Sequence, residues 1–211
     1  THQPLLVQIV ASAPPMRLNT AIVFLLIAFG LAALSDNRVR VARLLGCVIL
    51  VFAGATLSQY VFQRDLGLDE LLLRDWCLVD DFRAGRMAIN TATSFVLTGL
   101  CFISLSLPRR LRYQPLAECL IGCLVLAVGA GSLLGYVTGL RGAYGWGGGF
   151  GMAIHTSAAL ALCGGTLILL ALRHERRWSE RSPAWLPLPI ATSVLTVTLV
   201  VAQAVRFEQQ H

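Results

Sequence analysis

The sequence contains no lysine and has few charged residues of any kind. Only 13% of its 211 residues are Asp, Glu, Lys or Arg, whereas soluble domains carry about 25% charged residues. Hydrophobic residues make up 56% of the chain, and the mean hydropathy is +0.70. This balance excludes an intrinsically disordered chain and argues against a soluble globule.

The sequence also lacks the short motifs of common enzymes. It has no phosphate-binding P-loop, no paired-histidine zinc motif, no Gly-x-Ser-x-Gly elbow and no Cys-x-x-Cys pair. Five of its six cysteines lie in apolar stretches, where cysteine packs as a small hydrophobe rather than forming a disulfide framework. We therefore expect no catalysis and no metal in these residues, while the identity of any cofactor stays open.

The apolar residues fall in blocks of about 20, the length that a helix needs to cross a hydrocarbon core of about 30 Å. We expect an all-α polytopic membrane bundle, with an external interfacial segment at residues 1–17 and the start of an external stalk or tail at residues 206–211. The membrane domain would span residues 18–205. Its six expected transmembrane helices are residues 18–34, 44–62, 88–107, 116–140, 152–172 and 185–205.

All 17 basic residues are arginine, and their placement predicts a topology. Ten lie in the loops after the first, third and fifth spans, whereas residues 64–86 balance four arginines with six acids. Because basic loops stay in the cytoplasm, we expect both ends of the chain to be periplasmic, in a multi-pass protein of the bacterial inner membrane. The net charge of +6 then indicates topology rather than a nucleic-acid partner.

Three spans open with similar phrases, which indicates an internal repeat of helix-loop-helix hairpins. Residues 16–21, 87–92 and 152–157 read Met-Arg-Leu-Asn-Thr-Ala, Met-Ala-Ile-Asn-Thr-Ala and Met-Ala-Ile-His-Thr-Ser. The second and fourth spans match at a constant spacing of 76 residues, which aligns Tyr60 with Tyr136. The first unit would need an earlier helix, which we expect a parent protein or a neighbouring chain to supply.

Polar residues at the outer ends of the spans form the candidate ligand site. Asn19, Asn90 and His155 each lie about one turn inside a helix, where a polar side chain turns toward a partner or a cavity. We favour a structural interpretation, in which they cap helices and hydrogen-bond neighbouring helices. The alternative is an outward-facing pocket. Its ligand-binding residues would be Asn19, Tyr60, Asn90, Tyr136, Trp146 and His155.

No expected span carries a charge at its centre, which argues against a proton pump or an ion-coupled carrier. Glu118 opens the fourth span close to an arginine-rich loop. We expect it to snorkel toward the interface or to pair with a charge there.

Several phrases resemble the membrane sensor regions of bacterial signalling proteins. They lie at residues 60–72, 85–92, 135–140, 144–147 and 152–156. Over nearly the whole chain the sequence is similar to a MASE-like multi-helix region that stands N-terminal to CHASE, PAS, histidine kinase or diguanylate cyclase modules. The resemblance implies an input domain of the inner membrane, with any enzymatic activity in a parent protein.

The sequence therefore predicts a sensory or anchoring membrane domain of a bacterial signal-transduction protein, with a histidine kinase or diguanylate cyclase as parent. Two alternatives stay open. One is a non-catalytic structural subunit of a larger membrane complex, and the other is a membrane protein that binds a small molecule or pigment. The expected partners are the lipid bilayer and a homodimer or larger membrane complex, with no nucleic acid.

Overall fold

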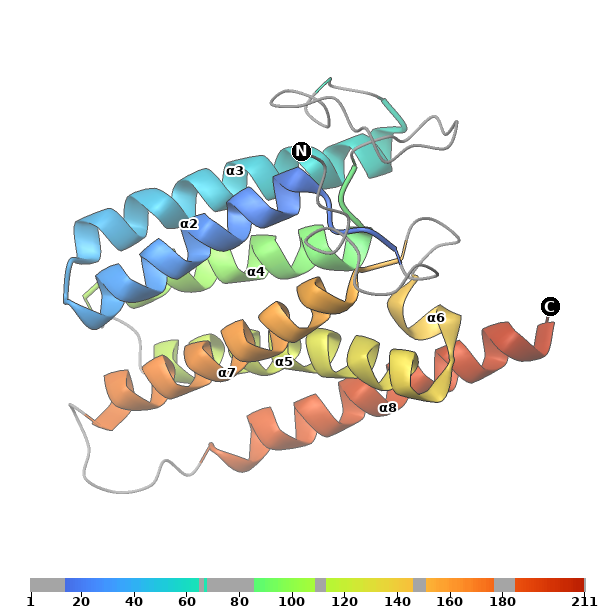
Figure 1. Cartoon of the computed structure of the whole chain (residues 1–211). Helices are drawn as coiled ribbons and strands as arrows, with labels where there is room; N and C mark the ends of the chain where they lie inside the picture. The colour runs from blue at the N-terminus through green and yellow to red at the C-terminus, as the bar shows by residue number, and fades with distance from the viewer. Residues whose placement is uncertain are drawn as a thin grey trace.

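The computed structural model describes residues 14–64, 67, 86–108, 113–145, 151–176 and 185–210, and within these residues the regular structure is entirely helical. Each expected span contains one long helix, with ends that differ by a few residues. In chain order (Figure 1), the helices are α2 (Leu18–Ser35), α3 (Val39–Phe62), α4 (Ile89–Leu105), α5 (Gln114–Thr138), α6 (Arg141–Tyr144), α7 (Ile154–Arg176) and α8 (Pro187–Gln210).

Local chemistry explains where several helices begin and end. The turn between α2 and α3 places Asn37 at φ 61°, a left-handed conformation that asparagine tolerates better than most residues. Pro115 lies in the first turn of α5, where its missing N–H removes no helical hydrogen bond. The same helix ends before Gly139 at φ 75°, as helices that close with a left-handed glycine do.

Helices α4 and α5 occupy the middle of the bundle. α4 contacts α2, α3, α5 and α7, while α5 contacts α4, α6, α7 and α8. The first residues of α2, α4 and α7 lie at the same end of the bundle as the last residues of α3, α5 and α8, together with the short helix α6 (Figure 1). We call this end the α6 end.

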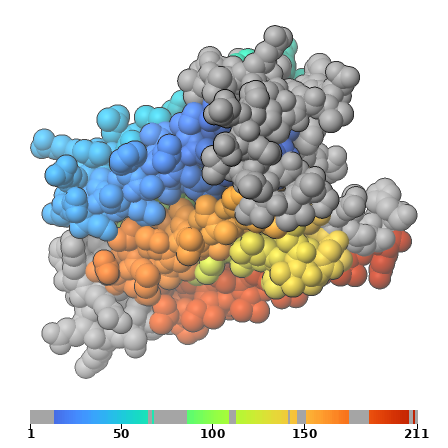
Figure 2. Space-filling model, in the orientation of Figure 1, coloured from blue at the N-terminus to red at the C-terminus, as the bar shows by residue number. Residues whose placement is uncertain are grey.

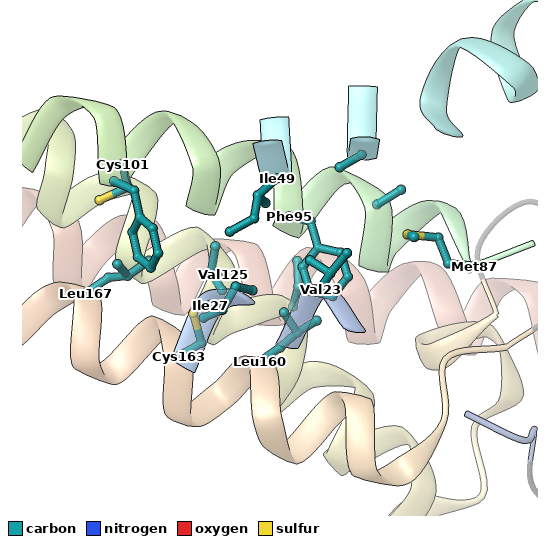
Figure 3. Close-up of a cluster of buried hydrophobic side chains, with 14 of the residues drawn as sticks. Val23, Ile27, Ile49, Met87, Phe95, Cys101, Val125, Leu160, Cys163 and Leu167 are labelled. Atoms are coloured by element: carbon teal, nitrogen blue, oxygen red, sulfur yellow. The ribbon is translucent and has the colours of Figure 1, made fainter. Parts of the chain in front are cut away.

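The main core lies between α2, α3, α4, α5 and α7 and is almost purely apolar. Phe95 and Phe102 on α4 are fully buried, and the ring of Phe95 meets that of Phe24 edge to face at 5.0 Å. Figure 3 shows side chains of this core from several helices, among them Ile49 and Leu160. The core therefore joins the α2–α4 half of the bundle to α7.

The outer surface of the bundle is apolar along its length. Leu25, Val51, Leu162 and Val194, from four different helices, expose 60–75% of their surface. Figure 2 shows α2, α7 and α8 following one another on one face of the molecule. Helices with apolar outer faces and internally bonded backbones match the requirements of a lipid bilayer.

Five of the described helices are long and apolar enough to cross a membrane, namely α2, α3, α5, α7 and α8. The remaining long helix, α4, is apolar but has 17 residues. Residues 206–210, where we expected a stalk or tail to begin, continue α8 as helix. Residues 1–13 of the expected interfacial segment lie outside the described residues.

Candidate functional site

A small recess lies at the α6 end, where α2, α4 and α7 begin. Its volume is about 20 Å³, enough for one or two water-sized groups. Each of the three helices contributes the two residues before its first residue and also its third residue. That third residue is a threonine in every case: Thr20, Thr91 and Thr156.

Two arginines give the recess a positive lining. Arg17 and Arg86 both line it, and only 9% and 6% of their surfaces are exposed. The guanidinium carbon of Arg86 lies 5.4 Å from the centre of the Tyr60 ring, a cation–π contact that fixes its position. Among the described lining residues none is acidic, and three helix N-termini add their positive dipole ends.

The three threonine hydroxyls differ from the other hydroxyls of these helices. The hydroxyls of Thr93 on α4 and Ser157 on α7 donate to the carbonyl four residues earlier, at 2.8 and 3.1 Å. Thr20, Thr91 and Thr156 are 2–3% exposed, yet their hydroxyls take part in none of the hydrogen bonds found among the described residues. These hydroxyls are therefore available to a group in the recess.

Two tyrosines bond to carbonyls that border the recess. The Tyr60 hydroxyl donates to the carbonyl of Met87 at 2.7 Å, and the Tyr136 hydroxyl donates to that of Met152 at 2.5 Å. Met87 and Met152 lie four residues before Thr91 and Thr156 and precede α4 and α7. Each tyrosine thus occupies an acceptor close to one of the threonines.

The predicted residues Asn19, Asn90 and His155 each precede a lining threonine in the sequence and do not line the recess themselves. Asn90 is 1% exposed, donates through Nδ2 to the Tyr144 carbonyl at 3.3 Å and accepts from the Thr91 N–H at 3.0 Å. Asn19 is buried at the second position of α2. His155 is half-buried, and its Nδ1 has no hydrogen-bond partner among the described residues. For Asn90 these contacts match the structural interpretation.

Tyr60 and Tyr136 do not line the recess but hydrogen-bond to the carbonyls of two lining residues, Met87 and Met152. Trp146 lies outside the described residues. A ligand-binding role for these residues stays a prediction. The recess residues that sequence analysis missed are the threonines and Arg17 with Arg86. The threonine that recurs in the three similar phrases was the sequence pattern that could have predicted the threonines of the recess.

The recess is connected to α8 through the short helix α6. The Met152 N–H donates to the Tyr144 carbonyl at 2.8 Å, and the rings of Tyr136 and Tyr144 stack with centroids 4.1 Å apart. Ala143, the neighbour of Tyr144, packs with Val200 and Ala204 of α8. We call this chain of contacts the α6 bridge.

Glu118 forms a separate polar cluster at the opposite end of the bundle. Its side chain is fully buried, and Oε1 accepts hydrogen bonds from Ser104 Oγ at 2.7 Å and from Gln114 Nε2 at 3.2 Å. Glu118 is therefore buried between α4 and α5, and its expected snorkelling or pairing at the interface stays a prediction. The two donors make burial tolerable because a buried carboxylate needs hydrogen-bond partners.

Among the described residues, no three His, Cys, Asp or Glu side chains form a group that could hold a metal ion. The recess is lined by residues that carry hydroxyl and guanidinium donors. Comparison with known protein families, with curated proteins and with solved structures finds no match to this chain.

Proposed function

We propose that the chain is a sensory or anchoring domain of the bacterial inner membrane that belongs to a signal-transduction protein, a histidine kinase or a diguanylate cyclase. The observation that carries this proposal is the α6 bridge, which links a polar recess at one end of the bundle to α8. We assign no catalysis to the residues of this chain.

A sensory domain needs a ligand site and an element that responds to it. The recess is the ligand site, and α8 is the responding element, since it packs mainly on α5 and α6 and is the least buried of the long apolar helices. A shift at the start of α7 would pass through the Tyr144 carbonyl and Ala143 to Val200 and Ala204. Such packed contacts can carry coupling when they have two arrangements.

We further propose six spans, α4 included, with both ends of the chain in the periplasm. A helix of 17 residues is at the lower limit of spanning length, and α4 is shielded by neighbours on several sides. The arginine-rich loops after α2, α4 and α7 support this orientation.

The internal repeat is also part of this proposal. Tyr60 and Tyr136, 76 residues apart, make the same hydrogen bond to a methionine carbonyl. Gly46 and Gly122 have the same spacing, and each lies at a close approach of its helix to the helix that follows in the hairpin. These parallels support one ancestral hairpin, used in α3–α4 and again in α5–α7.

The proposed assembly is a homodimer or a larger membrane complex. Its support is α8, whose Ile190, Val194 and Leu199 expose more than half of their surface and suit either lipid or another helix. A pigment-binding role has less support at this site, since about 20 Å³ is far below the roughly 300–1,000 Å³ of typical ligand pockets.

The test uses the complete reading frame that contains this chain, assayed in membrane vesicles for autophosphorylation or for cyclic di-GMP synthesis. Ala204→Leu inserts a large side chain into the buried α6–α8 contact, where Ala204 is fully buried. Ala202→Leu is the matched control, because Ala202 lies exposed on the same helix. We expect Ala204→Leu to change the output several-fold and Ala202→Leu to leave it unchanged.

Two results would overturn the proposal. One is a reading frame without any kinase or cyclase module. The other is an output that responds equally to both alanine substitutions, since the α6 bridge would then have no special role.

A further inference from the structure

We infer that the recess at the starts of α2, α4 and α7 binds a small anionic group. This inference names the ligand class of the proposed sensory domain and to that extent rests on the proposed function. Binding itself can be measured without any output module.

The first part of the argument is the convergence of three helix N-termini on one cavity. The hydrogen-bond ladders of α2, α4 and α7 begin with Ala21 N–H to Arg17 O, Ala92 N–H to Ala88 O and Ser157 N–H to Ala153 O. The N–H groups of the first three residues in each helix therefore lie outside the ladder, and of these the Thr91 N–H is already bonded to Asn90 Oδ1. α2 and α4 also have no side-chain cap, and anions complement such ends.

The second part is independent of the helix ends. Thr20, Thr91 and Thr156 are at least 97% buried and line the cavity, yet their hydroxyls bond to nothing among the described residues. The three oxygens are not among the fully buried side-chain atoms that lack a partner, so they are accessible from the recess, whereas other hydroxyls in these helices donate to their own helix. A ligand with several acceptor atoms would satisfy all three at once.

The third part is the sign of the charge around the cavity. Arg17 and Arg86 line it, and none of its described lining residues carries a negative charge. Both arginines also have a further polar contact, so the choice of ligand rests on the hydroxyl and helix N-terminal donors, which favour an acceptor over a donor.

The cavity size limits the ligand. A volume of about 20 Å³ accommodates one small ion or the charged group of a larger molecule. A free halide or oxyanion and the phosphate of a lipid headgroup share this chemistry. The experiment must therefore distinguish these two sources.

The test titrates the chain of 211 residues in phosphatidylcholine nanodiscs with sodium chloride, nitrate or phosphate, each replacing sodium gluconate at constant ionic strength. Binding is followed by thermal unfolding and, for chloride, by chlorine NMR line width. A parallel series replaces part of the phosphatidylcholine with phosphatidylglycerol. Saturable binding in the first series identifies a free anion, and stabilisation only in the second identifies a headgroup.

The variants separate the hydroxyl from the shape of the side chain. Thr91→Val removes the hydroxyl and keeps the shape, and we expect about ten-fold weaker binding for one lost charged hydrogen bond. Thr91→Ser keeps the hydroxyl and should bind nearly as the parent does. Thr93→Val is the matched control on the same helix, since the Thr93 hydroxyl donates to the Ile89 carbonyl away from the recess. The triple variant Thr20→Val, Thr91→Val, Thr156→Val should lose binding altogether.

Retained helix content, measured by circular dichroism, and a single size-exclusion peak would show that each variant is folded. The inference is overturned if neither small anions nor phosphatidylglycerol act saturably on the parent chain. It is equally overturned if the triple variant binds as the parent does, or if Thr93→Val loses as much affinity as Thr91→Val. Intact anion binding with no effect on signalling would instead contradict the proposed function alone.

Discussion

In both the α3–α4 and the α5–α7 hairpin, glycines allow the backbones of the two helices to approach each other. The two hairpins differ in how near those backbones come. In the first, a Cβ added to Gly99 would lie 2.8 Å from the Gly46 carbonyl oxygen. In the second, a Cβ on Gly164 would lie 2.7 Å from the Gly122 carbonyl oxygen and would also overlap the backbone nitrogen of Leu126. Both hairpins therefore bring two helix backbones together through glycine, as small residues do in membrane bundles.

The α5–α7 hairpin adds a third close approach that its counterpart lacks. A Cβ on Gly129 would lie 2.5 Å from the Ala161 nitrogen, whereas the position 76 residues earlier is the fully buried Ala53. At this position α3 therefore accommodates a methyl group that the corresponding position of α5 cannot.

The largest effect expected from a single substitution is at Gly164. Gly164→Ala would place a methyl group against backbone atoms of α5, which cannot move aside as a side chain can, so we expect a loss at or above about 3 kcal/mol. A Cβ added to the neighbouring Gly165 would instead point into open space, with no atom within 4 Å. Gly165→Ala should be neutral or stabilise the helix by up to about 1 kcal/mol.

The free energy of unfolding in mixed micelles is measured for Gly164→Ala, Gly165→Ala and the parent chain. Gly99→Ala extends the comparison to the other hairpin and should be less destabilising than Gly164→Ala, since the nearest atoms to the added Cβ lie at 2.8–3.1 Å rather than 2.3–2.7 Å. Equal losses for Gly164→Ala and Gly165→Ala would show that the close approach does not determine stability.

A second difference between the hairpins lies at the end opposite to α6. α5 buries Glu118 there, whereas the position 76 residues earlier in α3 is the fully buried Ala42. Glu118→Leu removes the acceptor of the Ser104 hydroxyl and one of the two acceptors of Gln114 Nε2, and we expect a loss of about 1–3 kcal/mol. Glu118→Gln keeps one acceptor oxygen and should lose less, as measured by the same unfolding assay.

If Glu118→Leu is at least as stable as Glu118→Gln, the hydrogen bonds of this cluster do not stabilise the fold. Replacing a buried polar network with an apolar side chain is sometimes neutral. The comparison of leucine with glutamine therefore decides whether the hydrogen bonds or the packing of this position matter more.

The sequence predicted the helices well because length and hydrophobicity are local properties. It placed the start of the second span at residue 44, whereas the helix α3 begins at Val39. The two differ because charged residues such as the arginines at 40 and 43 interrupt an apolar block without interrupting a helix. The helix α8 likewise continues past Arg206, as a polar helical tail would.

The sequence led to the correct turn of each helix but to the neighbouring side chain. It selected Asn19, Asn90 and His155, whereas the recess is lined by the threonines that follow them. Adjacent residues on a helix point about 100° apart, so which of the two faces the recess depends on how three helices meet. The burial of Arg86 likewise depends on the Tyr60 ring beneath it, which lies far away in the sequence.

The smallest expected effects compare the two tyrosines. Tyr60→Phe and Tyr136→Phe each remove one hydroxyl donor to a methionine carbonyl, and we expect each to cost about 0.5–1.5 kcal/mol of unfolding free energy. Phenylalanine keeps the ring that contacts Arg86 in one case and Tyr144 in the other. Losses of similar size would support the equivalence of the hairpins, and clearly unequal losses would contradict it.

The same substitution also tests how the recess keeps its hydroxyls available. In Tyr60→Phe the Met87 carbonyl loses its donor, so the Thr91 hydroxyl can turn back to that carbonyl, and anion affinity should fall. In a background that already carries Thr91→Val there is no hydroxyl to turn, so Tyr60→Phe should leave the remaining affinity unchanged. A double-mutant cycle measured by anion titration isolates this coupling. Additive losses would mean that Tyr60 acts on the recess by another route, such as the position of Arg86.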